Sequence, residues 1–149
     1  MTLKLSCAKI EIKLKEVVIM NLIVCLDTRL GMMFNKRRQC SDRVQAEDMR
    51  KLLSGEPLSV SAYTERLLCD SGIKLSVSDN PARTSGYCFI EDTALPAIED
   101  VEKLIIYNWG ERYPSDKRFT LDISAFRLIE SCEFCGSSHE KITREIYVK

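Results

Sequence analysis

The 149-residue sequence contains a single histidine and carries no net charge, and both scarcities exclude classes of protein. Twenty-two lysine and arginine residues balance twenty-two aspartate and glutamate residues, so no overall field attracts nucleic acid or an anionic membrane. No apolar run approaches the ~20 residues that a membrane-spanning helix needs. We therefore expect no membrane partner, and nucleic acid would have to bind through a local patch.

The N-terminus lacks the unbroken apolar centre of a secretion signal, because lysine and glutamate alternate there with leucine and isoleucine. We interpret residues 1–19 as an N-terminal extension that precedes a domain spanning 20–149, with Met20 as the natural start. The alternative is an additional edge strand. The seven cysteines form an odd set, and several lie inside apolar runs, which is typical of free thiols in a reducing compartment. We therefore expect a cytoplasmic protein.

Apolar runs and helical patterns alternate along residues 20–149. Asp42 is a good helix N-cap, and Gln45 three residues later completes the pattern of a capping box. Helices are predicted over 42–53, 62–71 and 95–101. Strands are predicted over 20–27, 58–60, 73–77, 86–90 and 103–109, followed by a hairpin of 126–134 and 142–148. This order predicts a single α/β domain with a mainly parallel central sheet and an antiparallel C-terminal hairpin.

The order of these elements and several residues resemble dihydrofolate reductase. The stretch LIVCLDTRLGMM, with Asp27 and Gly31, is similar to the first strand of that family and the loop after it. Asp42, at the start of the first predicted helix, matches the position of the family's active-site carboxylate. The segments GYCFIEDTALPAIEDVEKLIIYNW, ERYPSDKRFTLD and REIYVK resemble later parts of the same family. The resemblance implies a dihydrofolate-reductase-like fold over residues 20–149.

The sequence departs from that family where the reductases hold the phosphates of NADPH. Glu91, Asp92 and Thr93 replace the glycine-rich turn, and two carboxylates would repel a pyrophosphate. The Gly-Arg-x-Thr motif is also missing, and the segment SVSAYTERL in its place keeps only Thr64. We therefore expect a reductase-like scaffold without a functional NADPH-binding loop.

Two further motifs, NKRRQCSDR and SHEKIT, are similar to short bacterial chains, some of which are labelled ribonuclease Z. That name implies a hydrolase with a His-x-His-x-Asp-His metal motif. The only histidine here is His139, so the motifs do not support the label.

Three adjacent cations, Lys36, Arg37 and Arg38, precede the predicted helix start at Asp42, and Arg43 follows it. Together they could hold a phosphate or carboxylate ligand. The alternative is a solvated loop in which Asp42 only caps its helix.

Glu91 and Asp92 follow one predicted strand, and Asn108 and Trp109 end its neighbour. Ligands of open α/β sheets bind at this edge. With Asp42, these carboxylates could bind Mg²⁺, which is our candidate cofactor. The alternative is an ordinary acidic loop.

The remaining candidates are aromatic and histidine side chains near the C-terminus. His139 could act as a general base, although a surface loop is the alternative. Aromatic residues around Trp109 alternate with basic ones and could stack nucleic-acid bases, but the zero net charge favours core packing.

Two functions from different classes remain open. The first is a pocket for a phosphorylated or nucleotide-like ligand, with hydrolase (ribonuclease) activity as one version. Its catalytic candidates are Asp42, Glu91, Asp92 and His139, and its ligand-binding candidates are Arg37, Arg38, Arg43, Asn108 and Trp109. The second is a non-catalytic descendant of the reductase scaffold that binds a ligand or a protein partner.

Overall fold

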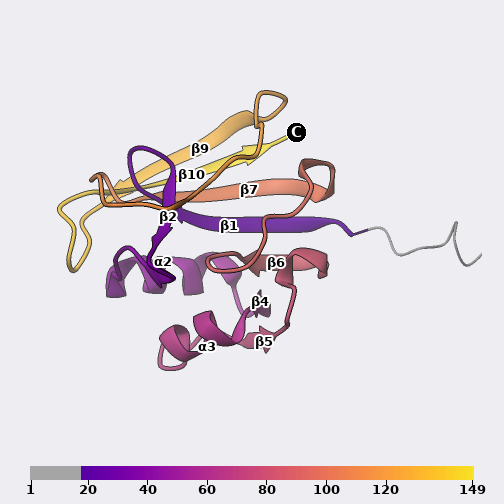
Figure 1. Cartoon of the computed structure of the whole chain (residues 1–149), viewed down its shortest axis with the longest axis horizontal. Coiled ribbons are helices and arrows are strands. Elements are labelled where there is room, and N and C mark those ends of the chain that lie inside the picture. Colours follow the sequence, from indigo (N-terminus) through magenta and orange to yellow (C-terminus); the bar gives the residue numbers. More distant parts are fainter. Residues whose placement is uncertain (1–17) are drawn as a thin grey trace, which may run out of the picture.

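Two β-sheets and two α-helices form the part of the chain that the computed structural model describes, residues 18–149 (Figure 1). The larger sheet has seven strands in the order β5-β4-β6-β1-β7-β10-β9, and the smaller has the order β3-β2-β8. The helices are α2 (Arg43–Leu53) and α3 (Ala62–Leu68), with 3-10 turns η1 (Pro81–Arg83) and η2 (Ile98–Asp100). The strands are β1 (Met20–Leu26), β2 (Gly31–Phe34), β3 (Arg37–Arg38), β4 (Leu58–Val60), β5 (Leu75–Val77), β6 (Gly86–Phe89), β7 (Val101–Asn108), β8 (Lys117–Arg118), β9 (Arg127–Phe134) and β10 (Ile142–Val148).

The large sheet confirms the predicted fold class. β1 lies at its centre and pairs in parallel with β6 and β7, and β4 pairs in parallel with β5 and β6. The C-terminal hairpin joins it antiparallel, because β10 pairs with both β7 and β9. A strand at the centre of such a sheet is covered on both faces, which explains why β1 is apolar almost throughout.

Alternating side chains of the central strands build one apolar core on each face of the sheet. On one face, Ile23 and Ile105 pack with Met49 and Leu53 of α2 and with Leu68 of α3. On the other face, Leu22, Val24, Leu104 and Ile106 pack with Met32, Met33 and Phe119. Within residues 18–149, α-helices therefore cover one face, while the small sheet and irregular segments cover the other.

Helix α2 begins where the sequence predicts. The carboxylate of Asp42 accepts hydrogen bonds from the backbone N–H groups of Val44 and Gln45, as an N-cap does. The capping box itself is incomplete, because within residues 18–149 the backbone N–H of Asp42 does not donate to the side chain of Gln45. Asp42 accepts other donors instead, as described below.

Other boundaries differ from the predictions. The helix expected over 95–101 is wrong: only η2 forms, and β7 already begins at Val101. Pro96 interrupts this segment, and Leu95 and Ile98 reach the core from irregular backbone. Helix α3 ends at Leu68 rather than Ser71.

The loop expected after the first strand contains a hairpin that the sequence did not reveal. Asn35 and Lys36, with φ of 56° and 61°, form the turn between β2 and β3. Two successive positive φ values are typical of a type I′ hairpin turn, which Asn-Gly usually forms. Because lysine occupies the second position here, the sequence gives no clear turn signal.

Most of the proposed N-terminal extension, residues 1–17, lies outside the described residues, and Val18 and Ile19 lead directly into β1.

No helix of residues 18–149 combines the length and apolarity that crossing a membrane requires. The six described cysteines, all except Cys7, are free thiols.

Candidate functional site

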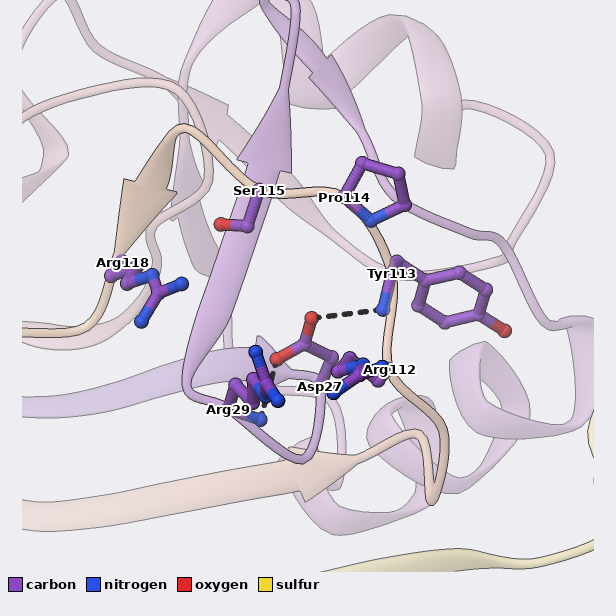
Figure 2. A pocket seen from close by; sticks show the side chains of 7 residues that line it. All are labelled: Asp27, Arg29, Arg112, Tyr113, Pro114, Ser115 and Arg118. Carbon is purple, nitrogen blue, oxygen red and sulfur yellow. Dashed lines mark hydrogen bonds between the residues drawn. The ribbon is translucent and has the colours of Figure 1, made fainter.

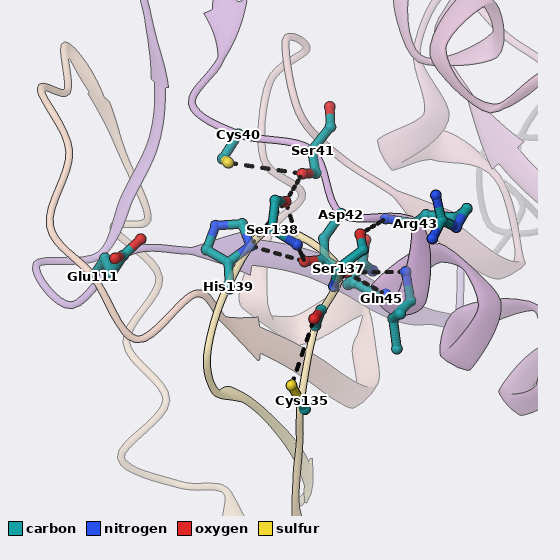
Figure 3. Close-up of polar contacts among 12 residues, drawn as sticks. Cys40, Ser41, Asp42, Arg43, Gln45, Glu111, Cys135, Ser137, Ser138 and His139 are labelled. Carbon is teal, nitrogen blue, oxygen red and sulfur yellow. Dashed lines mark hydrogen bonds and ion pairs between the residues drawn. The ribbon is translucent and has the colours of Figure 1, made fainter.

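The carboxylate of Asp42 is the centre of a buried polar cluster that joins the start of α2 to the loop between β9 and β10 (Figure 3). Besides its own helix, it accepts hydrogen bonds from the backbone N–H groups of Ser137 (3.0 Å) and Ser138 (2.9 Å). Nδ1 of His139 lies 3.0 Å from Oδ2 of Asp42, and both side chains are fully buried.

The charge of Asp42 is stabilised by these donors. Burial acts to raise the pKa of the carboxyl group. The hydrogen bonds from His139 and from the N–H groups of Ser138, Ser137 and Gln45 outweigh it, and the pKa lies well below the ordinary value of 3.8. Asp42 is therefore an anion in the folded protein at neutral pH.

His139 is held on three sides. Its ring stacks on the indole of Trp109 with centroids 4.7 Å apart, and Nε2 lies 3.0 Å from the hydroxyl of Tyr113. Because ionised Asp42 can only accept, Nδ1 of His139 carries a proton. His139 is 5% exposed. The alternative that it lies in an exposed surface loop is wrong for this reason.

Tyr113 links this cluster to the surface. Its hydroxyl oxygen lies 2.5 Å from Oε2 of Glu111 as well as 3.0 Å from Nε2 of His139. A phenol has one proton to donate, so both contacts are satisfied only if His139 donates from Nε2 or Glu111 is protonated. Burial and the bond to Glu111 raise the pKa of Tyr113, which keeps the phenol protonated.

Arg38 and Glu91 form a second buried network, separate from the Asp42 cluster. Nε and Nη2 of Arg38 contact the two carboxylate oxygens of Glu91 at 2.7 and 2.5 Å. The hydroxyl of Thr64 donates to the same carboxylate at 2.8 Å, and Ser61 donates to Asp92 at 2.6 Å. The segment that follows β6 is thus bonded directly to α3 and its N-cap, Ser61.

The structure therefore divides the sequence candidates between two places. Asp42 lies with His139, and Glu91 lies with Asp92; several donors of the chain bind the carboxylates of Asp42 and Glu91, and Ser61 binds that of Asp92. The expected Mg²⁺ arrangement is not formed, because no group of three or more His, Cys, Asp or Glu side chains within residues 18–149 is placed to hold a metal ion.

Three other candidates have roles in packing or remain in solvent. Trp109 is buried at 4% exposure under His139, and Asn108 accepts a hydrogen bond from the N–H of Gly110. Arg43 begins α2, and Figure 3 shows its side chain directed away from His139.

Arg37 and Arg38 line a surface cavity of about 670 Å³, which we call the hairpin cavity because the β2–β3 hairpin forms one wall. Its other lining residues are Phe34, Asn35, Gln39, Tyr113 and Pro114. Gln39 is a residue that sequence reasoning missed. Nε2 donates to Asp27 and to the carbonyl of Pro114, whereas Oε1 is buried without a partner among the described residues.

The sheet order, the parallel centre and the C-terminal hairpin define an α/β protein of dihydrofolate-reductase-like fold. A solved structure of dihydrofolate reductase from Enterococcus faecalis, complexed with NADP(H) and RAB-propyl, is similar to this chain with a TM-score of 0.60. The similarity covers 87% of this chain and 95% of the reductase at 10% sequence identity, so it shows the fold alone. No curated protein matches the sequence.

The sequence model of the family described as phosphoglucomutase/phosphomannomutase, alpha/beta/alpha domain I, matches residues 20–112. This match spans more than half of the chain, and the chain belongs to this family. The match covers β1 to β7 and leaves out the C-terminal hairpin. The absence of an α-helix on one face of the sheet in residues 18–149 departs from the layering in the family's description. The family is unrelated to the ribonuclease Z label.

Proposed function

We propose that this protein binds a phosphorylated, nucleotide-like ligand in the hairpin cavity. The observation that carries the proposal is an unpaired guanidinium and an unpaired buried acceptor in the walls of one cavity. The guanidinium of Arg37 makes no hydrogen bond or ion pair within residues 18–149, and Oε1 of Gln39 is buried without a donor there.

The guanidinium of Arg37 needs an acceptor in the ligand, whereas the amide oxygen of Gln39 needs a donor. A free guanidinium recognises a phosphate through charge-assisted hydrogen bonds. A buried acceptor without a donor costs free energy, and an N–H or O–H of a ligand that reaches Gln39 would recover it. A nucleotide provides both, as a phosphate and as base or ribose donors.

Phe34 adds an apolar wall to the same cavity. The residue is 44% exposed although its side chain is large and apolar. Aromatic rings exposed beside a cation are suitable surfaces for stacking a base. Arg38 borders the cavity as well, but its guanidinium is already paired with Glu91.

NADPH is not the expected ligand. The hydrogen bonds of Thr64 to Glu91 and of Ser61 to Asp92 occupy the segments where the resemblance would place its phosphates. None of the four catalytic candidates lines the hairpin cavity. The proposal is therefore for binding rather than for hydrolysis. The names of the matching family refer to phosphorylated hexoses, which makes a sugar phosphate the natural second ligand to test.

The test is calorimetric titration of the full chain with adenosine monophosphate, glucose 6-phosphate and NADPH. We expect adenosine monophosphate to bind, and Arg37→Gln to weaken it by at least about tenfold, the cost of one charge-assisted hydrogen bond. Phe34→Ser should weaken the nucleotide but not the sugar phosphate, which has no base to stack.

Lys36→Gln is the matched control, because Lys36 is an exposed cation of the same hairpin that does not line the cavity. Equal losses in Arg37→Gln and Lys36→Gln would show general charge attraction and contradict the proposal. Binding of NADPH alone would contradict it as well.

A further inference from the structure

A second cavity, of about 400 Å³, lies beside the hairpin cavity and shares Tyr113 and Pro114 with it. Three arginines, Arg29, Arg112 and Arg118, line it together with Asp27 and Ser115, and we call it the arginine cavity (Figure 2). Figure 2 shows these side chains around Asp27, with Arg118 extending from β8.

The three guanidinium groups are not used by the fold. Within residues 18–149, none of them makes a hydrogen bond or an ion pair. Three like charges around one cavity repel one another, and a bound anion would remove that repulsion.

Asp27 would be the obvious partner for these arginines, but its carboxylate is already satisfied. Oδ1 accepts from the backbone N–H groups of Arg29 (2.8 Å) and Gly31 (2.7 Å). Oδ2 accepts from the N–H of Tyr113 and from Nε2 of Gln39, both at 3.1 Å. The residue is fully buried. Although burial acts to raise the pKa of Asp27, these hydrogen bonds lower it, so the carboxylate is ionised without needing a guanidinium.

Backbone contacts fix the walls of the cavity. The N–H of Thr28 donates to the carbonyl of Glu111 at 3.0 Å, and the N–H of Phe119 donates to the carbonyl of Leu30 at 2.8 Å. Arg118 lies opposite Gly31 in the pairing of β8 with β2. A Cβ at Gly31 would lie 2.7 Å from Oδ2 of Asp27, so only glycine allows this close approach. The arginines are therefore attached to backbone held in place before any ligand binds.

We infer that the arginine cavity is a binding site for a phosphoryl dianion, either inorganic phosphate or the phosphate of a monoester. Three arginines against one saturated carboxylate leave the lining positively charged, and forked guanidinium donors match the oxygen geometry of a phosphoryl group. This site does not include Arg37, so the inference does not rest on the proposed function.

The inference is tested by titrating the full chain with inorganic phosphate and with glycerol 3-phosphate, at an ionic strength held constant with sodium chloride. We expect saturable binding at one site. Replacing the three arginines together (Arg29→Gln, Arg112→Gln, Arg118→Gln) should weaken it by at least about tenfold, since charge-assisted hydrogen bonds are lost.

The matched control removes three exposed arginines elsewhere on the molecule, Arg66→Gln, Arg83→Gln and Arg127→Gln, with the same loss of charge. Binding should survive in this variant and in Arg37→Gln. Equal weakening in both triple variants, or binding that does not saturate, would overturn the inference. If only inorganic phosphate binds, the ligand is the free anion; if glycerol 3-phosphate binds equally well, the cavity accepts a monoester. Loss of nucleotide binding in Arg37→Gln with phosphate binding intact would separate the two sites.

Discussion

The carboxylate of Asp42 and the imidazole of His139 lie 3.0 Å apart inside the protein, although 97 positions separate them in the sequence. Asp42 caps α2, and His139 belongs to the loop between β9 and β10, so this contact attaches the C-terminal hairpin to the first helix. Because both side chains are fully buried, removal of either one leaves the other without its partner and destabilises this region.

Replacing Asp42 by asparagine should strongly destabilise the protein. The amide cannot be an anion, and its NH₂ group would face the donors at Ser138 and His139. We expect a loss of about 3 kcal/mol in the free energy of unfolding, which is typical when one partner of a buried pair is removed. Urea denaturation measures it. Asp79→Asn, at an exposed position, is the control, and a similar loss there would show that the buried pair is not the cause.

The stability should depend on pH through the same residue. The pKa of Asp42 in the folded protein lies below its ordinary value of 3.8, so its stabilising contribution is complete above that value and is lost as the pH falls. The free energy of unfolding should therefore decrease below about pH 4. The decrease should be shallower in Asp42→Asn than in the wild type. If the free energy of unfolding depends on pH in the same way in both proteins, other carboxylates cause the acid sensitivity.

The protonation of His139 can be read directly, because it is the only histidine in the chain. Since Asp42 can only accept, Nδ1 should carry a proton throughout the pH range in which the protein is folded and Asp42 is ionised. A long-range proton–nitrogen correlation spectrum of the imidazole distinguishes the two nitrogens. Tyr113→Phe should change the environment of Nε2 and leave Nδ1 protonated. A neutral ring protonated only at Nε2 would contradict the hydrogen bond to Asp42.

The Arg38–Glu91 pair should be strongly coupled. Glu91→Leu leaves the largely buried guanidinium of Arg38 without its anion, and we expect a loss of about 3 kcal/mol in the free energy of unfolding. Combining it with Arg38→Met should cost less than the sum of the two single changes, with a coupling energy of about 1–3 kcal/mol in a double-mutant cycle. The exposed pair of Glu47 and Arg50 is the comparison, and Glu47→Ala should have no measurable effect. Additive losses at Arg38 and Glu91 would show that their contact does not stabilise the fold.

Local patterns were enough to predict the fold class and much of the secondary structure. Short apolar runs identified β1, β4, β6 and β7, because strands inside a sheet are covered on both faces, and the alternation of apolar and polar residues identified the hairpin. The N-cap at Asp42 is equally local, since its donors lie two and three residues away. Where a local signal was weak, as at the Asn35–Lys36 turn, the prediction failed.

The site residues show what the sequence alone determined and what it did not. It identified Asp42 as a helix N-cap and His139 as the only histidine, and it placed Glu91 and Arg38 in short runs of like charge. Only the tertiary structure decided that Asp42 pairs with His139 and Glu91 with Arg38, since each contact joins segments 97 and 53 positions apart. It also left the arginines around Asp27 free, because backbone N–H groups of the loops near Gly31 and Tyr113 satisfy that carboxylate. The pairing of donors and acceptors depends on how segments far apart in the sequence pack together, and a local sequence pattern does not contain that information.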